Sequence, residues 1–162
     1  MVLSPPASGS IPRLVLDPCM LLARRDEAEI TTLLGSCIAV CLWDPKRGCG
    51  GMNHYMLPLW NGDGLPTPKY GNVAIEKLVE KMLTFGCRKE DLVAKYFGGA
   101  NVIGDTSGRM LIGERNIALA DEVLAIHRIP VVAKDAGGTR GMKIIFNTRT
   151  GLVLAGRLAS RS

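Results

Sequence analysis

Cys37 and His54 are the residues best suited to covalent chemistry, because they lie on two short β-prone segments joined by a turn-forming sequence. A thiol becomes a nucleophile when an adjacent imidazole lowers its pKa and takes up its proton. Near the open end of a hairpin the two strands face each other, so these two side chains can meet. The pattern is compatible with nucleophilic catalysis. Spacing alone favours the alternative, in which Cys37 is a buried, inert side chain, as most free cysteines are.

The two residues before this cysteine are candidates for a supporting role. Gly35 and Ser36 are small, and the turn that they imply can leave backbone N–H groups free beside the thiol. Free N–H donors in such a place stabilise the oxyanion of an acyl-transfer intermediate. We therefore expect the backbone at Gly35 and Ser36 to supply oxyanion donors.

Zinc binding is a second interpretation of the same region, because Cys37, Cys41, Cys49 and His54 are all potential ligands. On one extended strand, however, Cys37 and Cys41 would be about 13 Å apart at roughly 3.3 Å per residue. Zn–S bonds are near 2.3 Å, so one zinc ion could not reach both sulfurs. The sequence favours the absence of a metal.

The remaining cysteines and the second histidine have structural interpretations. Five cysteines cannot all form disulfides, and the N-terminal sequence lacks the pattern of a secretory signal, so we expect free thiols in the cytoplasm. Cys19, Cys41 and Cys87 are expected to be packed thiols and Cys49 an exposed turn residue. His127 lies on the apolar stripe of a predicted helix, and we expect it to be a packed residue.

Three glycine-rich stretches, at residues 98–101, 104–108 and 137–141, contain neither a P-loop nor a dinucleotide-binding fingerprint. We expect no nucleotide cofactor, and interpret these stretches as tight loops that form a pocket wall or approach a substrate. A Ser–His–Asp hydrolase is not indicated, because no Gly-x-Ser-x-Gly motif occurs.

The surrounding pattern predicts an α/β fold. Apolar residues at helical spacing predict helices over residues 73–85 and 114–127. Strands are predicted at residues 38–43, 51–57, 92–97, 130–133, 142–147 and 152–157, with hairpin turns at 44–48 and 148–151. Strands outnumber helices and are tightly joined, which favours a mixed or antiparallel sheet flanked by helices.

Composition limits the function classes. A chain of 162 residues with 47% hydrophobic and 22% charged residues is typical of one globular domain. The net charge is +5, but the basic residues are dispersed and are not interleaved with aromatic residues. We therefore expect acidic protein partners and no nucleic acid. No apolar run reaches the roughly 20 residues that a membrane helix needs.

Longer motifs add a resemblance to a known family. The string TTLLGSCIAVCLWDP at residues 31–45, followed by GMNHYMLP at residues 51–58, closely resembles the chemoreceptor glutamine deamidase family (CheD). The resemblance continues in order through KYG at 69–71, FGGA at 97–100, IGERN at 112–116, DAGGTR at 135–140 and FNTRTG at 146–151. It covers nearly the whole chain from about Leu14.

The resemblance implies a catalytic set of Cys37, His54 and Thr31, with Thr31 positioning the histidine or the substrate amide. It also implies a compact α/β sandwich, similar to the catalytic domains of deamidating toxins, over residues 14–162, after a flexible segment at 1–13. The implied reaction converts glutamines of chemotaxis receptors to glutamates with release of ammonia, through a thioester. A CheC-type phosphatase is an implied partner. The alternative function is a catalytically idle module that binds such a phosphatase.

Overall fold

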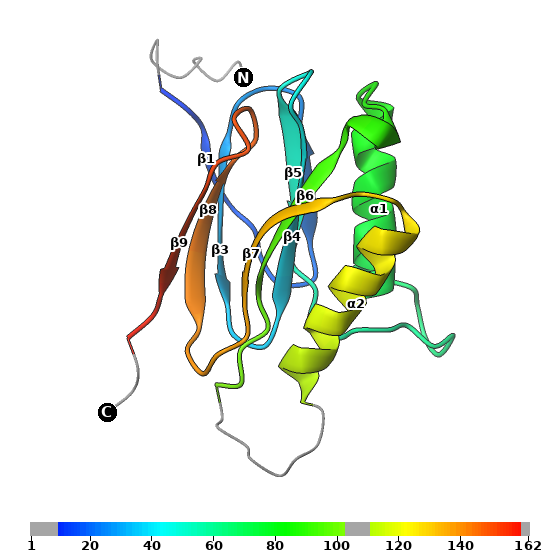
Figure 1. Ribbon diagram of the computed structural model, residues 1–162, viewed down its shortest axis with the longest axis vertical. Helices are drawn as coiled ribbons and strands as arrows, with labels where there is room; N and C mark the ends of the chain where they lie inside the picture. Colours follow the sequence, from blue (N-terminus) through cyan, green and yellow to red (C-terminus); the bar gives the residue numbers. More distant parts are fainter. Residues whose placement is uncertain (1–9, 103–110, 160–162) are drawn as a thin grey trace, which may run out of the picture.

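Two β-sheets pack face to face, and two α-helices cover the outer face of one of them (Figure 1). The computed structural model describes residues 10–102 and 111–159. The first sheet has the order β1-β3-β8-β9, and the second has the order β2-β5-β4-β6-β7. Pairing is antiparallel except between β1 and β3 and between β6 and β7.

The elements have the following bounds. The first sheet contains β1 (Arg13–Val15), β3 (Glu29–Leu34), β8 (Met142–Asn147) and β9 (Val153–Arg157). The second contains β2 (Leu21–Arg24), β4 (Ile38–Asp44), β5 (Cys49–Asn53), β6 (Val93–Gly98) and β7 (Val131–Ala136). The helices are α1 (Gly71–Thr84) and α2 (Ile112–Ile126), with a short 3₁₀ helix at Lys89–Asp91.

Strand β4 lies at the centre of both cores, which is why its sequence is almost continuously apolar. Ile38, Val40 and Leu42 face the helices, whereas Ala39 and Cys41 face the first sheet, and all five are buried. Burying a large aliphatic side chain contributes about 1.5–3 kcal/mol. The strand that begins next to Cys37 is therefore held from both sides.

The predicted mixed α/β class is confirmed, with helices on one sheet only. Both helices begin two residues earlier than the sequence pattern indicated. The start of α1 at Gly71 is a close approach, because a Cβ there would collide with the Leu119 side chain of α2. The predicted strand at 51–57 ends as β5 at Asn53, and the short strands β1, β2 and β3 were not predicted.

Two predicted segments lie outside the described residues, one of them wholly and the other in part. The glycine-rich stretch at 104–108 lies outside them, as do residues 1–9 of the predicted N-terminal segment. Within the described chain, Arg13 already belongs to β1 and pairs with Glu29. Neither described helix is both long enough and apolar enough to cross a membrane.

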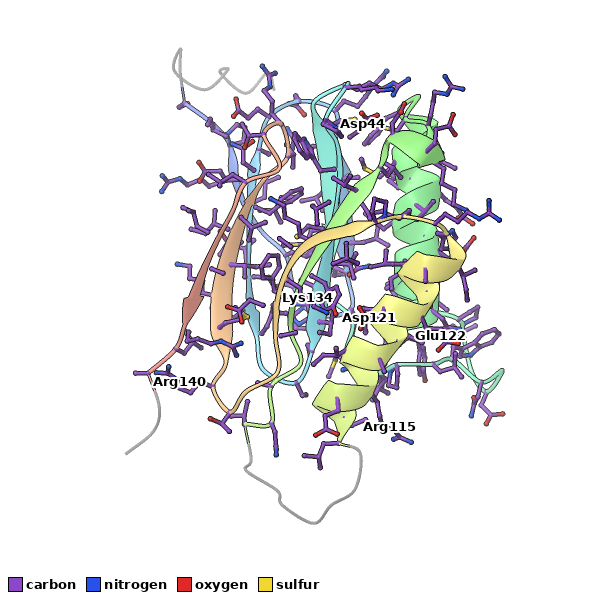
Figure 2. All side chains as sticks on the ribbon, in the orientation of Figure 1. Asp44, Arg115, Asp121, Glu122, Lys134 and Arg140 are labelled. Atoms are coloured by element: carbon purple, nitrogen blue, oxygen red, sulfur yellow. The ribbon has the colours of Figure 1, made fainter. Side chains whose placement is uncertain are left out.

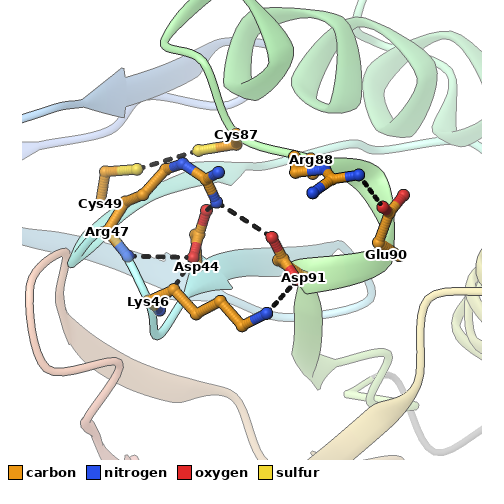
Figure 3. Close-up of polar contacts among 8 residues, drawn as sticks. All are labelled: Asp44, Lys46, Arg47, Cys49, Cys87, Arg88, Glu90 and Asp91. Atoms are coloured by element: carbon orange, nitrogen blue, oxygen red, sulfur yellow. Dashed lines mark hydrogen bonds and ion pairs between the residues drawn. The ribbon is translucent and has the colours of Figure 1, made fainter.

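The prediction that Cys49 is an exposed turn residue is wrong. Cys49 is opposite Asp44 in the β4–β5 hairpin, and the side chains of both are buried, with their sulfur and carboxylate atoms within 4.8 Å of the sulfur of Cys87, which follows α1. The Cys49 and Cys87 sulfur atoms are 3.0 Å apart (Figure 3). The Cys49 side chain at the turn end of the β4–β5 hairpin, which the sequence predicted to be exposed, is therefore buried by the helix.

Asp44 is the charged centre of this cluster, and its side chain is fully buried. Burial by itself would raise its pKa, but hydrogen bonds from the Arg47 guanidinium and from the Lys46 and Arg47 N–H groups keep the pKa below its usual value. Arg47 also contacts Asp91 at 3.0 Å. The cluster thus joins the hairpin to the segment after α1.

We predict that Asp44→Asn lowers the free energy of unfolding by about 2–3 kcal/mol at pH 7, because several charge-assisted hydrogen bonds are lost. Since the pKa of Asp44 is lowered by folding, its contribution is complete above about pH 4 and is lost as the pH falls further. Urea denaturation at several pH values measures this. The exposed Asp26→Asn is the control, with an expected loss below about 1 kcal/mol. Equal losses for the two variants would contradict the prediction.

Candidate active site

Cys37 and His54 lie on either side of the last rung of the β4–β5 ladder. That rung is the pair Ile38–Tyr55, in which the Ile38 N–H donates to the Tyr55 carbonyl at 3.1 Å and the Tyr55 N–H donates to the Ile38 carbonyl at 2.9 Å. Ile38 and Tyr55 face the helices, so the residues before them face the first sheet. Cys37 and His54 are thus diagonal neighbours on one face, and such pairs lie roughly 7–8 Å apart, within reach of the long imidazole side chain.

Thr32 of β3 holds the imidazole from the opposite sheet. The Thr32 hydroxyl is 2.7 Å from His54 Nδ1 and donates its single proton to the Leu16 carbonyl at 2.8 Å. Its oxygen therefore has only lone pairs left for the histidine, so Nδ1 must carry the ring proton and donate it. In the neutral ring, Nε2 is then the free base.

Burial sets the charge state of both reactive groups. It lowers the pKa of His54 to about 4, against the opposing effect of Asp17. It also raises the pKa of Cys37, to which the nearby Cys19 adds. At neutral pH the site therefore holds a neutral imidazole and a neutral thiol, so proton transfer must accompany attack by sulfur.

The turn before β4 has its carbonyl groups tied back. The carbonyl oxygens of residues 35, 36 and 37 accept hydrogen bonds from the Ala100 N–H (2.9 Å), Asn116 Nδ2 (2.9 Å) and the Gly99 N–H (2.8 Å), respectively. Their own N–H groups have no acceptor on another residue in the described chain. A Cβ at Gly98, whose φ is +109°, would collide with the Cys37 carbonyl, so a glycine is needed there.

A pocket of about 460 Å³ opens beside Ser36 at the start of α2, at the end of the molecule where β3 turns into β4. The described residues that line it are mostly apolar: Ser36, Ala100, Asn101, Val102, Leu111, Ile112 and Gly113. Arg115 and Arg140 lie at this end of the molecule and Asp44 at the other (Figure 2). The pocket therefore opens next to the residue that precedes Cys37.

The structure brings Thr32, rather than Thr31, to the histidine. Thr31 lies on the opposite face of β3, between Val15 and Ile145, on the side of the first sheet that the described helices do not cover. One sequence signal could have identified Thr32: it shares an alternating pattern with the apolar residues Ile30 and Leu34. That alternation places its hydroxyl between the sheets.

Cys19 is a second residue that the sequence did not assign to the site. Its N–H donates to the His54 carbonyl at 2.8 Å, and its sulfur is 3.3 Å from Met56 Sδ. Its φ of 68° is in the left-handed region, which is uncommon for a residue with a Cβ. It is only half-buried, so this thiol, which the sequence predicted to be packed, borders the site.

The residues weighed as zinc ligands do not converge. Cys41 faces the first sheet and Cys49 faces the helices, on opposite sides of the second sheet. The donor atoms of Asp44, Cys49 and Cys87 do lie within 4.8 Å of one another. Two sulfurs bound to tetrahedral zinc would be roughly 3.8 Å apart, whereas these are 3.0 Å apart. Asp44 is also already bound by Arg47, so this group does not fit zinc.

Comparisons with known proteins agree with the motifs. The family model described as CheD chemotactic sensory transduction matches residues 56–157. A protein of Trichlorobacter lovleyi named probable chemoreceptor glutamine deamidase CheD is 63% identical over 132 residues, which are 82% of each chain. A protein of the same name from Sulfurimonas denitrificans is 54% identical over 126 residues, 77% of this chain and 81% of that one.

Among solved structures, the Bacillus licheniformis hypothetical protein YfiH is similar with a TM-score of 0.43 and 13% identity. The match covers 67% of this chain and 46% of that chain.

We predict that the rate of Cys37 alkylation by iodoacetamide keeps rising with pH up to at least about pH 9 without a plateau, because the thiolate is the reactive form and the pKa of this thiol lies above its usual value of 9.0. Mass spectrometry of the Cys37 peptide at each pH measures the rate, and the buried Cys41 in the same protein is the unreactive control. A rate plateau extending below pH 7 would indicate a thiolate–imidazolium pair and contradict the neutral site.

Proposed function

This chain belongs to the CheD family, and we propose that it is an amidohydrolase that converts glutamine side chains of chemotaxis receptors to glutamate and releases ammonia. The observation that carries the proposal is the placement of Cys37 and His54 on one face of the hairpin, with Thr32 fixing the imidazole. The names of the relatives support the same substrate, since both are probable chemoreceptor glutamine deamidases. The proposed nucleophile is Cys37 and the proposed base is His54.

The first half of the reaction forms a thioester. His54 Nε2 takes the Cys37 proton as the sulfur attacks the carboxamide carbon of the glutamine. The negative charge that develops on the amide oxygen is stabilised by backbone N–H groups of the turn at residues 35–37. The imidazolium then gives its proton to the leaving nitrogen, the C–N bond breaks, and ammonia departs.

The second half releases the product. His54 takes a proton from water, the resulting hydroxide attacks the thioester carbon, and the C–S bond breaks. The sulfur recovers a proton from the imidazolium, which leaves a glutamate side chain and the free thiol. The same acyl chemistry would accept a glutamate methyl ester, because only the leaving group differs.

The low pKa of His54 suits the breakdown of an amide. An imidazole with a pKa near 4 is a weak base, but its conjugate acid is strong. Expulsion of nitrogen from the tetrahedral intermediate requires protonation, and a strong acid transfers its proton readily. Burial of the ring between the sheets therefore favours the step that amide hydrolysis makes difficult.

Several expectations from the family resemblance stay predictions. They are a catalytic role for Thr31, a CheC-type phosphatase as partner, and a likeness to deamidating toxin domains. The alternative function, a catalytically idle binding module on the same fold, does not account for a buried imidazole whose tautomer is fixed beside a thiol.

We predict that the protein converts glutamines in a purified receptor cytoplasmic fragment, with a mass gain of about one dalton per residue as –NH₂ is replaced by –OH. Cys37→Ala should lower the rate by at least about 10⁴-fold, because the nucleophile is lost. Peptide mass spectrometry and ammonia release measure the reaction. Conversion that persists in Cys37→Ala would exclude the thioester route, and no conversion by the wild-type protein would favour the binding module.

Two adjacent threonines provide a matched pair of variants for the positioning of His54. We predict that Thr32→Val lowers kcat by about 10- to 100-fold with little change in KM, because Nδ1 loses its acceptor and the tautomer is no longer fixed. Thr31→Val should change kcat by less than about twofold, since its side chain lies on the other face of the strand. Steady-state kinetics of ammonia release decide between them. A larger effect at Thr31 would support the role that the family resemblance implies.

A further inference from the structure

Asn116 joins the two backbone segments that carry the candidate catalytic residues. It lies in the second turn of α2, and its side chain is fully buried. Its Nδ2 donates to the carbonyl oxygens of Ser36 at 2.9 Å and of Met56 at 3.0 Å. The backbone carbonyl of Asn116 accepts a hydrogen bond from the Tyr55 hydroxyl at 2.6 Å. One amide thus holds the residue before Cys37 and a residue two positions after His54.

This amide takes the place of a missing rung in the β-ladder. Beyond the pair Ile38–Tyr55 the two strands diverge, because the Met56 and Leu57 N–H groups both donate to the Lys69 carbonyl. The Ser36 carbonyl therefore has no donor on the neighbouring strand. Buried carbonyl groups are almost always hydrogen-bonded, and here the donor comes from the helix.

The hydrogen bond to Ser36 also sets the direction of the next N–H group. The Ser36–Cys37 peptide is trans, so its C=O and N–H point in opposite directions. With the carbonyl held toward Asn116, the Cys37 N–H must point away from the helix. Burial raises the pKa of the Cys37 thiol, and the N–H group of the same residue acts in the opposite sense.

The Oδ1 atom of Asn116 has no hydrogen-bond partner among the described residues. This atom is also buried. A buried polar atom without a partner destabilises a fold, so such a group calls for an explanation. The contacts of Nδ2 with the turn before Cys37 provide one.

We propose that Asn116 is a positioning residue that fixes the Cys37 N–H as a donor to the oxyanion of the acyl-transfer intermediate. The proposal rests on the proposed thioester chemistry at Cys37 and adds a group that acts on it through the backbone. Loss of this amide would leave the thiol and its base in place. It would allow the Ser36–Cys37 peptide to rotate, so that stabilisation of the oxyanion is lost.

Two reagents separate this role from a purely structural one. Acylation of Cys37 by 4-nitrophenyl acetate passes through a tetrahedral oxyanion, whereas alkylation by iodoacetamide does not. For Asn116→Ala we expect the acylation rate to fall at least about tenfold and receptor glutamine conversion about 100-fold, which is typical of one lost oxyanion donor. The alkylation rate should stay within about twofold of the wild-type value.

Controls keep the outcome unambiguous. Asn116→Leu, which preserves bulk without a donor, should behave as Asn116→Ala does. Leu124→Ala, in the buried core at the far end of α2, should lower the melting temperature and leave both rates per folded molecule unchanged.

Equal losses of acylation and alkylation in the Asn116 variants, or an unchanged acylation rate, would overturn the proposal. If the wild-type protein is acylated by the ester but converts no receptor glutamine, the proposed function fails, whereas the ester comparison still decides the role of Asn116.

Discussion

The hydrogen bond between Thr32 and His54 is the interaction on which the candidate site depends. It is a polar contact across the interface of two sheets whose other facing residues are largely apolar. A buried imidazole without a partner would be costly, and this bond satisfies it while the Leu16 carbonyl takes the threonine proton. Packing of the sheets, the tautomer of the histidine and its low pKa are therefore consequences of one arrangement. The same burial that secures the core determines the acid–base behaviour of the ring.

The site also depends on where regular pairing stops. The ladder of β4 and β5 ends at Ile38–Tyr55, and the residues just beyond it have backbone groups that no neighbouring strand can satisfy. The carbonyl groups of residues 35–37 accept hydrogen bonds from the N–H groups of Gly99 and Ala100 and from the side chain of Asn116. The N–H groups of the same three residues have no acceptor on another residue in the described chain. Free donors at the end of a strand are a structural liability in most sheets. Here one of them, the Cys37 N–H, belongs to the residue that carries the thiol, where the proposed chemistry needs a donor.

The local parts of this arrangement were predictable from the sequence. The turn at residues 44–48 and the two helices follow from short-range patterns. Thr32 was obscured because its alternation with Ile30 and Leu34 is embedded in a longer apolar run, and β1 has only three residues. Asn116 contacts carbonyl groups 80 and 60 positions away, and no local pattern encodes such a contact. Burial of Cys49 likewise depends on the distant segment after α1.

The hairpin of β4 and β5 has a consequence for how the site assembles. Its two strands are adjacent in the chain and pair with each other, so forming it closes a short loop and costs little chain entropy. The β3–β8 pairing, by contrast, joins residues more than a hundred positions apart. We expect the nucleophile and its base to meet early in folding, as an immature pair exposed to water. Docking of the first sheet would then deliver Thr32 and exclude solvent, so that reactivity matures only with the last long-range contacts of the chain.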